Sequence, residues 1–310
     1  MELTLDKLLS LFLATKQIEG KSASTLDWYR KRLGKFLAYF EDGRIADLTL
    51  NNARSFVAHL QDRETLYDGH PITPEREGKL SPYTIHGYVR AIKAFGTFLE
   101  EEGYCANPFK RLKRPEVPKN IIEVLTEDEI RTIEKSINPR CFLGARMLAV
   151  FHTLLDTGIR ADELLTLKID SIDFKDQSMM VHGKGDKERI VPFGATCKRT
   201  LMKYLITWRP ESTTDYVILS VSGTPLTYDA LAHLVKRLGE KNDVPRLHAH
   251  LLRHTFAVRY LLNGGDLMTL KLILGHEEIS TTQKYLHLAN QHIVARHHTF
   301  SPLDRINAVR

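Results

Sequence analysis

The chain has 310 residues, which is enough for two domains because single hydrophobic cores commonly stop growing at roughly 250 to 300 residues. Its formal net charge of +6 and pI of about 9.1 suit a polyanionic partner without requiring one. No stretch approaches the ~18 apolar residues of a membrane span and the N-terminus has no signal-peptide pattern, so we expect a cytoplasmic protein with no membrane partner.

Residues 1–106 predict a helical first domain. Ser24 is a candidate N-cap for a helix whose apolar side chains recur every three or four residues as far as Phe40, with Arg30 and Lys31 between them. A second helix is expected from the Ser81-Pro82 pair, which is favoured at helix starts, to a point before Gly103.

Two shorter helices are expected over residues 4–18 and 50–62 of this domain. The polar stretch 62–80 contains two prolines and no periodicity, so it predicts an extended loop or a small insertion. The three cysteines, Cys105, Cys141 and Cys197, form neither a disulfide framework nor a C-x-x-C zinc pattern.

Residues 107–124 predict a linker between the two domains. Its three prolines disfavour regular structure. Its basic side chains suit either a solvated hinge or a segment that contacts phosphates. The candidate DNA-binding residues here are Lys110, Arg111, Lys113 and Arg114.

Residues 125–310 predict a second domain that begins with a capping box formed by Thr126 and Glu129. The run 141–155 is apolar almost all round, which indicates a buried helix. Residues 156–158 then break that helix and lead Arg160 into the next one.

The hydrophobic period changes after residue 168, where three short strands are expected over 169–174, 178–182 and 189–193. Gly183 and Gly185 fall at the tip of the second hairpin. Helices are expected to resume after these strands.

Cations, imidazoles and one phenol gather between residues 250 and 285. His250 and Arg253 share a helix face, so both can reach one anion. Gly275 should end the next helix and place His276 in the following turn. Ser280 is a candidate N-cap that would put Tyr285 one turn into a new helix. Because nearby positive charge favours a phenolate, Tyr285 is a candidate nucleophile for phosphoryl transfer.

Five motifs in this order and spacing resemble the tyrosine recombinase (phage integrase) family, above all its Xer-like and mobile-element members. They are a Thr-Gly-hydrophobic-Arg-x-x-Glu box at residues 157–163, a hairpin lysine at Lys184, a His-x-Leu-Arg-His box at residues 250–254, a Leu-Gly-His turn ending at His276, and a Thr-Thr-x-x-Tyr motif ending at Tyr285. Over the first hundred residues the resemblance rests on pattern alone.

The resemblance implies a mainly α fold with a small β-sheet. An N-terminal helical core-binding (SAM-like) domain would join a C-terminal mixed α/β catalytic domain, and the two would clamp duplex DNA from opposite sides. The implied partners are double-stranded DNA with a specific recombination site and three further copies in a tetramer on two DNA sites, possibly with a second, different recombinase. Residues 288–310 would dock on a neighbouring copy, or alternatively form a lid on their own copy.

The implied reaction is strand exchange through a 3′-phosphotyrosyl intermediate formed by Tyr285. Arg160 and Arg253 suit the extra negative charge of the transition state because each guanidinium donates two parallel hydrogen bonds and stays protonated. Glu163 would support a cation of the site. Two structural salt bridges are the alternative for the arginines.

The family motif makes Lys184 the general acid for the departing 5′ oxygen, and Lys187 is its rival in the same hairpin tip. Lys187 and Arg189 are then phosphate contacts or solvated charges. His250 would be the general acid or base paired with Tyr285, and His276 a hydrogen-bond donor to the phosphate.

His254 reads as a packed, hydrogen-bonded histidine. The chain has no His-Glu-x-x-His pattern or clustered carboxylates, so no metal and no other cofactor is expected. Two other functions remain open at this point. One is DNA relaxation of the type IB topoisomerase kind, and the other is DNA binding without catalysis.

Overall fold

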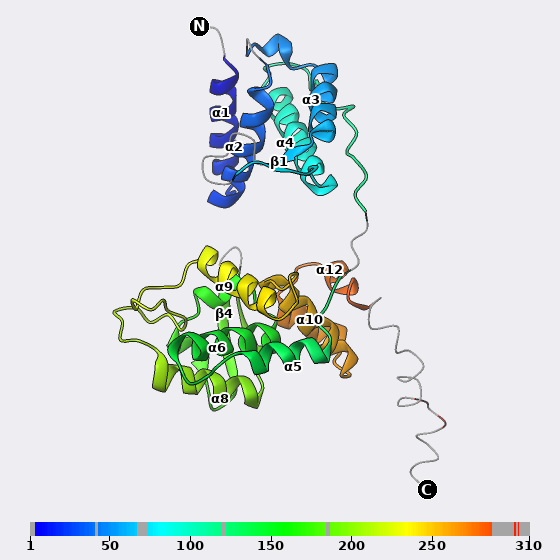
Figure 1. Cartoon of the computed structure of the whole chain (residues 1–310). Coiled ribbons are helices and arrows are strands. Elements are labelled where there is room, and N and C mark those ends of the chain that lie inside the picture. Colours follow the sequence, from blue (N-terminus) through cyan, green and yellow to red (C-terminus); the bar gives the residue numbers. More distant parts are fainter. Residues whose placement is uncertain are drawn as a thin grey trace. The chain divides into compact units, whose positions relative to one another are not determined.

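The chain folds into two compact units, Met1–Asn120 and Ile121–Arg310 (Figure 1). The computed structural model describes residues 4–40, 43–66, 74–118, 122–183, 187–286, 301 and 303. Helices dominate both units and the sheets are small, as the sequence predicted. Among the described residues, no helix combines the length and the apolar character needed to cross a membrane.

The first unit is a group of helices with a small strand pair in the connection between the last two. Its elements are α1 (Leu5–Ile18), α2 (Ala23–Leu37), the 3-10 turn η1 (Ile45–Asp47), α3 (Leu50–Asp62), β1 (Thr65–Leu66), β2 (Arg76–Glu77) and α4 (Pro82–Glu101). The helices expected over 4–18 and 50–62 are confirmed. The stretch expected to be a loop or insertion contains the antiparallel pair β1–β2.

The two longer helices of this unit differ in how well their starts were predicted. Helix α4 begins as expected, since the Ser81 hydroxyl accepts from the amide of Thr84 at 3.2 Å and proline occupies the first turn. The predicted start of α2 is wrong. Ser22 is the N-cap and accepts from the amide of Thr25 at 3.4 Å, while Ser24 lies within the first turn.

Aromatic side chains fill the core of the first unit. Phe12 of α1 meets the rings of Tyr29 and Phe95 edge-on, with centroids 5.1 and 5.6 Å apart. Phe36 of α2 packs in the same manner on Phe109. Edge-to-face pairs of this kind add to the free energy gained by burial alone.

The start of the predicted linker belongs to this core. Phe109 and Leu112 are buried. The Lys93 ammonium donates to the carbonyls of Phe109, Lys110 and Leu112 at 2.9 to 3.4 Å. The packed part of the first unit therefore runs past residue 106 to residue 112. The backbone just before Lys113 and Arg114 is held in place by this packing.

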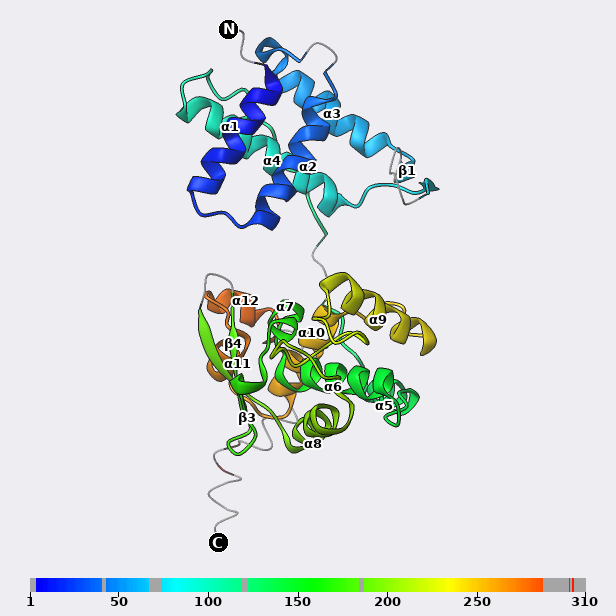
Figure 2. The ribbon, with the colours of Figure 1, turned by 90° about the vertical axis from the view of Figure 1, so that its left-hand side faces the viewer.

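The second unit combines helices with a small sheet that lies at one edge of the unit in Figure 2. Its elements are α5 (Glu127–Ser136), α6 (Phe142–Thr157), α7 (Ala161–Leu165), the 3-10 turn η2 (Ile169–Ser171), β3 (Ile172–Asp173), β4 (Ser178–His182), β5 (Glu188–Pro192), α8 (Ala195–Lys203), the π-helical turn η3 (Tyr204–Trp208), α9 (Tyr228–Lys241), α10 (Ala249–Leu262), α11 (Leu267–Leu274) and α12 (Ile279–Gln283).

The three strands form an antiparallel sheet in the order β3-β4-β5. Met179 lies opposite Val191, and both are buried. The first strand is shorter than predicted because residues 169–171 turn away as η2, where the amide of Ile169 donates to the carbonyl of Asp215 instead. The third strand starts and ends one residue earlier than predicted.

Helix α6 is buried, as the apolar run indicated, and it packs against α8 and α10. Gly158 ends it in the left-handed region with φ of 63°. A β-carbon at this position would stand 2.2 Å from the Phe256 ring, so the turn requires glycine for both conformation and space. This turn directs the next residues, Ile159 into the core and Arg160 outward.

Candidate active site

Arg160 and Glu163 are joined at the start of α7. The Glu163 carboxylate accepts from the Arg160 amide at 2.8 Å and from the Arg160 guanidinium at 2.8 Å. Burial by itself would raise the pKa of Glu163, but hydrogen bonds from Arg189 and Arg160 outweigh it and lower the pKa to about 2. Glu163 is therefore a buried carboxylate, and the Arg160 side chain stays 39% exposed beside it.

Arg189 shares the same carboxylate. Its two terminal nitrogens donate to the two oxygens of Glu163 at 2.8 Å each, and its Nε donates to the carbonyl of Ile273 at 2.7 Å. The sequence predicted a phosphate contact or a solvated charge at this position. The structure differs, since the side chain is only 13% exposed and is held by these partners.

Arg253 lies on α10 and is the largest fully buried side chain among the described residues. It donates to the carbonyls of Gly158 at 2.7 Å and Leu274 at 2.8 Å. These carbonyls lie at the C-terminal ends of α6 and α11, where the helix dipole favours a cation. Burial, and then the charge of Arg160, lower the pKa of Arg253 to about 10, so it stays protonated at neutral pH.

His276 follows the turn at Gly275, as predicted. Its Nε2 is 3.0 Å from an Arg253 nitrogen and its Nδ1 is 2.9 Å from the Thr282 hydroxyl. Burial and the charges of Arg253 and Arg160 lower the pKa of His276 to about 4. A neutral ring that accepts from Arg253 carries its proton on Nδ1, so the predicted donation to a phosphate requires a change of partners.

Tyr285 lies just beyond the last described helix. Helix α12 has Glu278 as its N-cap and ends at Gln283. The predicted cap at Ser280 and the predicted place of Tyr285 inside the helix are therefore wrong. The phenol is 4% exposed and packs with Leu270 and Leu274 of α11, so tertiary packing holds it.

The phenol oxygen of Tyr285 is 2.8 Å from Nδ1 of His254. The predicted partner, His250, instead meets the His254 ring edge-on, with centroids 4.3 Å apart. Burial, followed by the charges of His250, His248 and Arg253, lowers the pKa of His254 to about 4. A neutral imidazole therefore contacts the phenol at neutral pH.

Cations alone do not set the ionisation of Tyr285. The charges of Arg253 and Arg160 favour the phenolate, as predicted, but burial outweighs them and raises the pKa of the phenol. Ionisation therefore requires a proton acceptor or a further positive charge close to the phenol oxygen.

A groove of about 770 Å³ lies against this cluster. Arg160, Lys187, Arg189 and His276 line it. Lys187 pairs with Glu277 at 2.7 Å, but both side chains are more than two-thirds exposed, so the pair is weak. Lys184, the predicted general acid, lies outside the described residues, although Gly183 at the base of its hairpin adjoins the groove.

Comparison with known proteins agrees with this geometry. Residues 123–292 match the phage integrase family. The chain is 31% identical to tyrosine recombinase XerD of Staphylococcus aureus over 305 residues, covering 96% of this chain and 99% of that protein. It is 30% identical to tyrosine recombinase XerC of Staphylococcus epidermidis over 299 residues, covering 93% and 95%. The chain belongs to the phage integrase family.

The fold comparison agrees. The crystal structure of the XerH site-specific recombinase bound to palindromic difH substrate has a TM-score of 0.71 at 21% identity, covering 96% of this chain and 85% of that chain. The protein is an Xer-like tyrosine recombinase, an enzyme of site-specific DNA recombination, as its motifs predicted.

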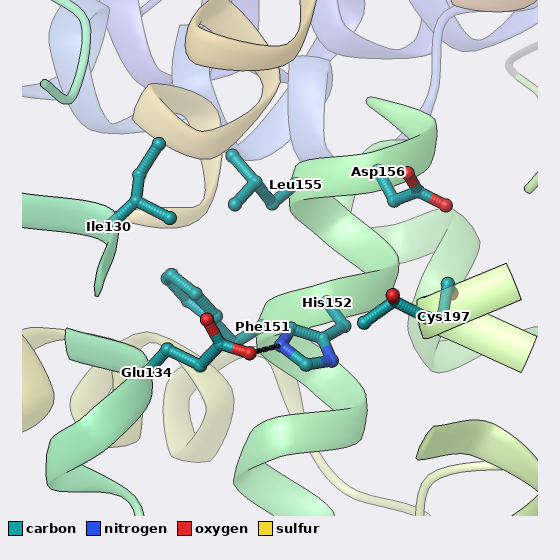
Figure 3. Close-up of a pocket in the computed structure, with 8 residues that line it drawn as sticks. Ile130, Glu134, Phe151, His152, Leu155, Asp156 and Cys197 are labelled. Atoms are coloured by element: carbon teal, nitrogen blue, oxygen red, sulfur yellow. Dashed lines mark hydrogen bonds and ion pairs between the residues drawn. The ribbon is translucent and has the colours of Figure 1, made fainter. Parts of the chain in front are cut away.

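A second pocket of this recombinase, of about 210 Å³, lies apart from the predicted site (Figure 3). His152 projects from α6 into it, and its Nε2 is 3.1 Å from Glu134 of α5. Cys197 forms part of the wall, and burial raises the pKa of its thiol to about 12, which makes the thiol inert. None of the predicted catalytic residues is among the described residues that line this pocket.

The predicted DNA-binding cations of the first unit are surface residues. Arg30, Lys110, Arg111, Lys113 and Arg114 are exposed. Lys31 is exposed as well and pairs with Asp27 at 2.7 Å. These cations are open to a polyanion, and their contact with DNA stays a prediction.

Two contacts of the recombinase site were not predicted from the sequence. His254 is packed and hydrogen-bonded, as expected, but the sequence did not identify its partner, which is the nucleophile candidate Tyr285. Thr282, fully buried, orients His276, and its only signal was its place in the Thr-Thr-x-x-Tyr motif. Within the described residues, no group of three or more metal-ligating side chains is found.

Proposed function

We propose that this recombinase cuts and rejoins duplex DNA through a covalent link between Tyr285 and a 3′ phosphate. The Tyr285 oxygen attacks the phosphorus, the bond from phosphorus to the 5′ oxygen breaks, and the phenol proton is lost. The reverse attack by a 5′-hydroxyl of a partner strand restores the DNA and frees Tyr285. Because bond energy is conserved, no nucleotide cofactor enters the scheme, and the proposed roles are all carried by side chains.

The observation that carries this proposal is the convergence of Arg160, Arg253, His276 and Tyr285. Arg253 contacts His276 at 3.0 Å, and the charges of Arg253 and Arg160 act on both His276 and Tyr285. In our scheme the two guanidiniums neutralise the charge that grows on the non-bridging oxygens. Glu163 orients Arg160. Lys184 protonates the 5′ oxygen.

The two histidines close to the phenol have separate roles in the scheme. His254 contacts the phenol oxygen and is the first acceptor for its proton. His250 packs on His254 and acts through it or takes its place when DNA binds. His276, held by Arg253 and Thr282, keeps the second arginine in place.

We further propose that the first unit is the core-binding domain, and that the cations after residue 112 follow the DNA backbone through the segment to the second unit. The packing of residues 109–112 on α4 supports this, because it fixes where those cations begin. The active form is a tetramer on two DNA sites in the cytoplasm, with a second recombinase as an alternative partner. The tail segment 288–310, nearly all of it outside the described residues, would join the copies.

The test is a nicked suicide duplex from which the 5′ end diffuses away after cleavage. The wild-type chain should accumulate a covalent adduct in buffer containing EDTA. Absence of an adduct on every duplex recovered from protein–DNA crosslinking in cells would refute the proposal.

A second assay separates recombination from relaxation. With two intact sites, the recombinase should yield joined products, and light scattering should record four copies in the active complex. Relaxed plasmid without joined product, formed by single copies, would favour the topoisomerase alternative.

A further inference from the structure

Arg189 stands where three parts of the site meet. It lies on β5, it donates two parallel hydrogen bonds to Glu163 of α7, and its Nε donates to Ile273 of α11. The family match and the sequence pattern assign it no role beyond a phosphate contact. Its hydrogen bonds suit a different role, because Nε and both terminal nitrogens already have acceptors and the side chain is only 13% exposed.

The charge balance of this cluster depends on Arg189. Glu163 is one carboxylate between two guanidiniums, those of Arg160 and Arg189. Arg189 occupies one position on each carboxylate oxygen, and Arg160 donates a single guanidinium nitrogen. Without Arg189, the whole charge of a buried carboxylate would act on Arg160 and hold it away from a phosphate.

Arg189 also fills the space beside two glycines. A β-carbon on Gly275 would stand 3.0 to 3.1 Å from the Cδ, Nε and Cζ atoms of Arg189, so this turn, which leads to His276, closes directly over the side chain. A β-carbon on Gly183 would stand 3.6 Å from the Nη1 atom of Arg189. The amide of Gly183 closes the base of the hairpin by donating to the carbonyl of Lys187 at 2.8 Å.

We propose that Arg189 is a positioning residue that shares the charge of Glu163 and so leaves Arg160 free for the scissile phosphate. It also ties the base of the lysine hairpin to the turn that carries His276. This inference rests on the proposed function. It replaces the expectation that Arg189 binds DNA directly.

The decisive variants are Arg189→Met and Arg189→Lys. With the suicide duplex at saturating protein, Arg189→Met should slow cleavage about 100-fold, the order of effect expected when a catalytic group is misplaced by about 1 Å. Arg189→Lys keeps the positive charge but cannot donate two parallel hydrogen bonds to Glu163. Its cleavage rate should therefore lie between those of Arg189→Met and the wild type. DNA affinity and its salt dependence should stay close to wild type. A direct phosphate contact would instead lower affinity and reduce the slope of log K against log salt by about one.

A double-mutant cycle distinguishes positioning from general loss of structure. In a Glu163→Gln background the buried charge is gone, so Arg189→Met should cost far less than in the wild-type background. A duplex with a neutral methylphosphonate at the cleavage point should likewise reduce the Arg189→Met defect. The methylphosphonate carries less negative charge, so its cleavage depends less on Arg160. Equal losses in both backgrounds and on both duplexes would overturn the proposal.

Arg209→Met is the matched control. Arg209 is a half-buried arginine of the same unit that donates to the carbonyls of Thr214 and Tyr216, both of which belong to a loop outside the site. The substitution should lower the melting temperature and leave the cleavage rate of folded protein within about twofold. If Arg189→Met does not fold, Arg189→Lys carries the same comparison. Adduct formation by the wild-type chain, measured in parallel, tests the proposed function separately.

Discussion

The candidate DNA-binding cations of the first unit and the buried arginines of the site in the second unit lie in opposite environments. In the first unit Arg30, Lys31 and Lys113 lie on the surface, outside an aromatic core. In the second unit Arg253 is 1% exposed and Arg189 is 13% exposed, and both have fixed acceptors. Exposed cations can neutralise phosphates without being held in one geometry, whereas buried ones are set in place before a phosphate arrives.

This difference implies that DNA affinity and the rate of DNA cleavage depend on different cations. A flexible surface lysine loses side-chain entropy when it binds and is screened by salt. The buried arginines have already lost that entropy on folding, and their desolvation is offset by helix-end carbonyls and by Glu163. The second unit is therefore expected to determine the rate of cleavage, and the surface cations the strength of binding.

The most severe test of the buried side is Tyr285→Phe. It removes one oxygen from a packed ring, so the fold should persist while covalent adducts with the suicide duplex disappear completely. Gel-shift binding should match wild type. Adducts that persist in this variant would assign the nucleophile to another residue.

Arg253→Lys should produce the next largest effect. The lysine keeps a charge but cannot reach the carbonyls of Gly158 and Leu274 and the ring of His276 together. We expect cleavage to fall about 100-fold to 1,000-fold, as when one fixed donor to a transition-state oxygen is removed. Single-turnover kinetics at saturating protein measure this.

Arg146→Lys is the control for Arg253→Lys. Arg146 is 4% exposed and donates to the carbonyl of Leu219, apart from the site. If Arg146→Lys lowered the cleavage rate as much as Arg253→Lys, the loss would reflect the burial of an arginine in general and not its place in the site. The distinction drawn between exposed and buried cations would then be wrong.

A smaller effect is expected from acid. Burial lowers the pKa of His254 from 6.5 to about 4, so the unfolded chain binds the proton more readily than the folded one between these values. The stability of the second unit should be full above about pH 6.5 and should fall as pH drops toward 4. The groups that face His254 are His250, His248, Arg253 and Tyr285.

His254→Asn tests that assignment, because the amide can occupy the Nδ1 position but cannot titrate. Its melting temperature should depend less steeply on pH between 6.5 and 4 than that of wild type. His276, His250 and His152, whose pKa values are lowered in the same direction, contribute to the remaining slope. If the melting temperatures of the two proteins changed equally with pH, His254 would not be a buried neutral group.

The smallest effect is expected on the exposed side. Lys113→Gln with Arg114→Gln should weaken DNA binding and lower the slope of log K against log salt by about 0.9 for each phosphate that the variant no longer neutralises. The cleavage rate at saturation should not change. The charge-preserving pair Lys113→Arg with Arg114→Lys should keep the wild-type slope. A lower cleavage rate at saturating protein in the glutamine variant would show that these cations contribute to the cleavage step.

The predictions from sequence succeeded where the signal is local. The cap at Ser81, the capping box at Thr126 and the end of α11 at Gly275 involve residues within four positions of each other. Two predicted N-caps were wrong. Ser22 takes the place of Ser24, and the last helix begins after Glu278, without a side-chain cap hydrogen bond, instead of after Ser280.

By itself, the sequence determined the family, the helical character of both units and a set of candidate residues for the site, because these depend on residue type, spacing and local hydrogen bonds. Only the tertiary structure decided the pairing of Tyr285 with His254, the burial of Arg189 against Glu163 and the upward shift of the Tyr285 pKa. The physical reason is distance along the chain. These partners are 31 and 26 residues apart, and burial is a property of the whole fold.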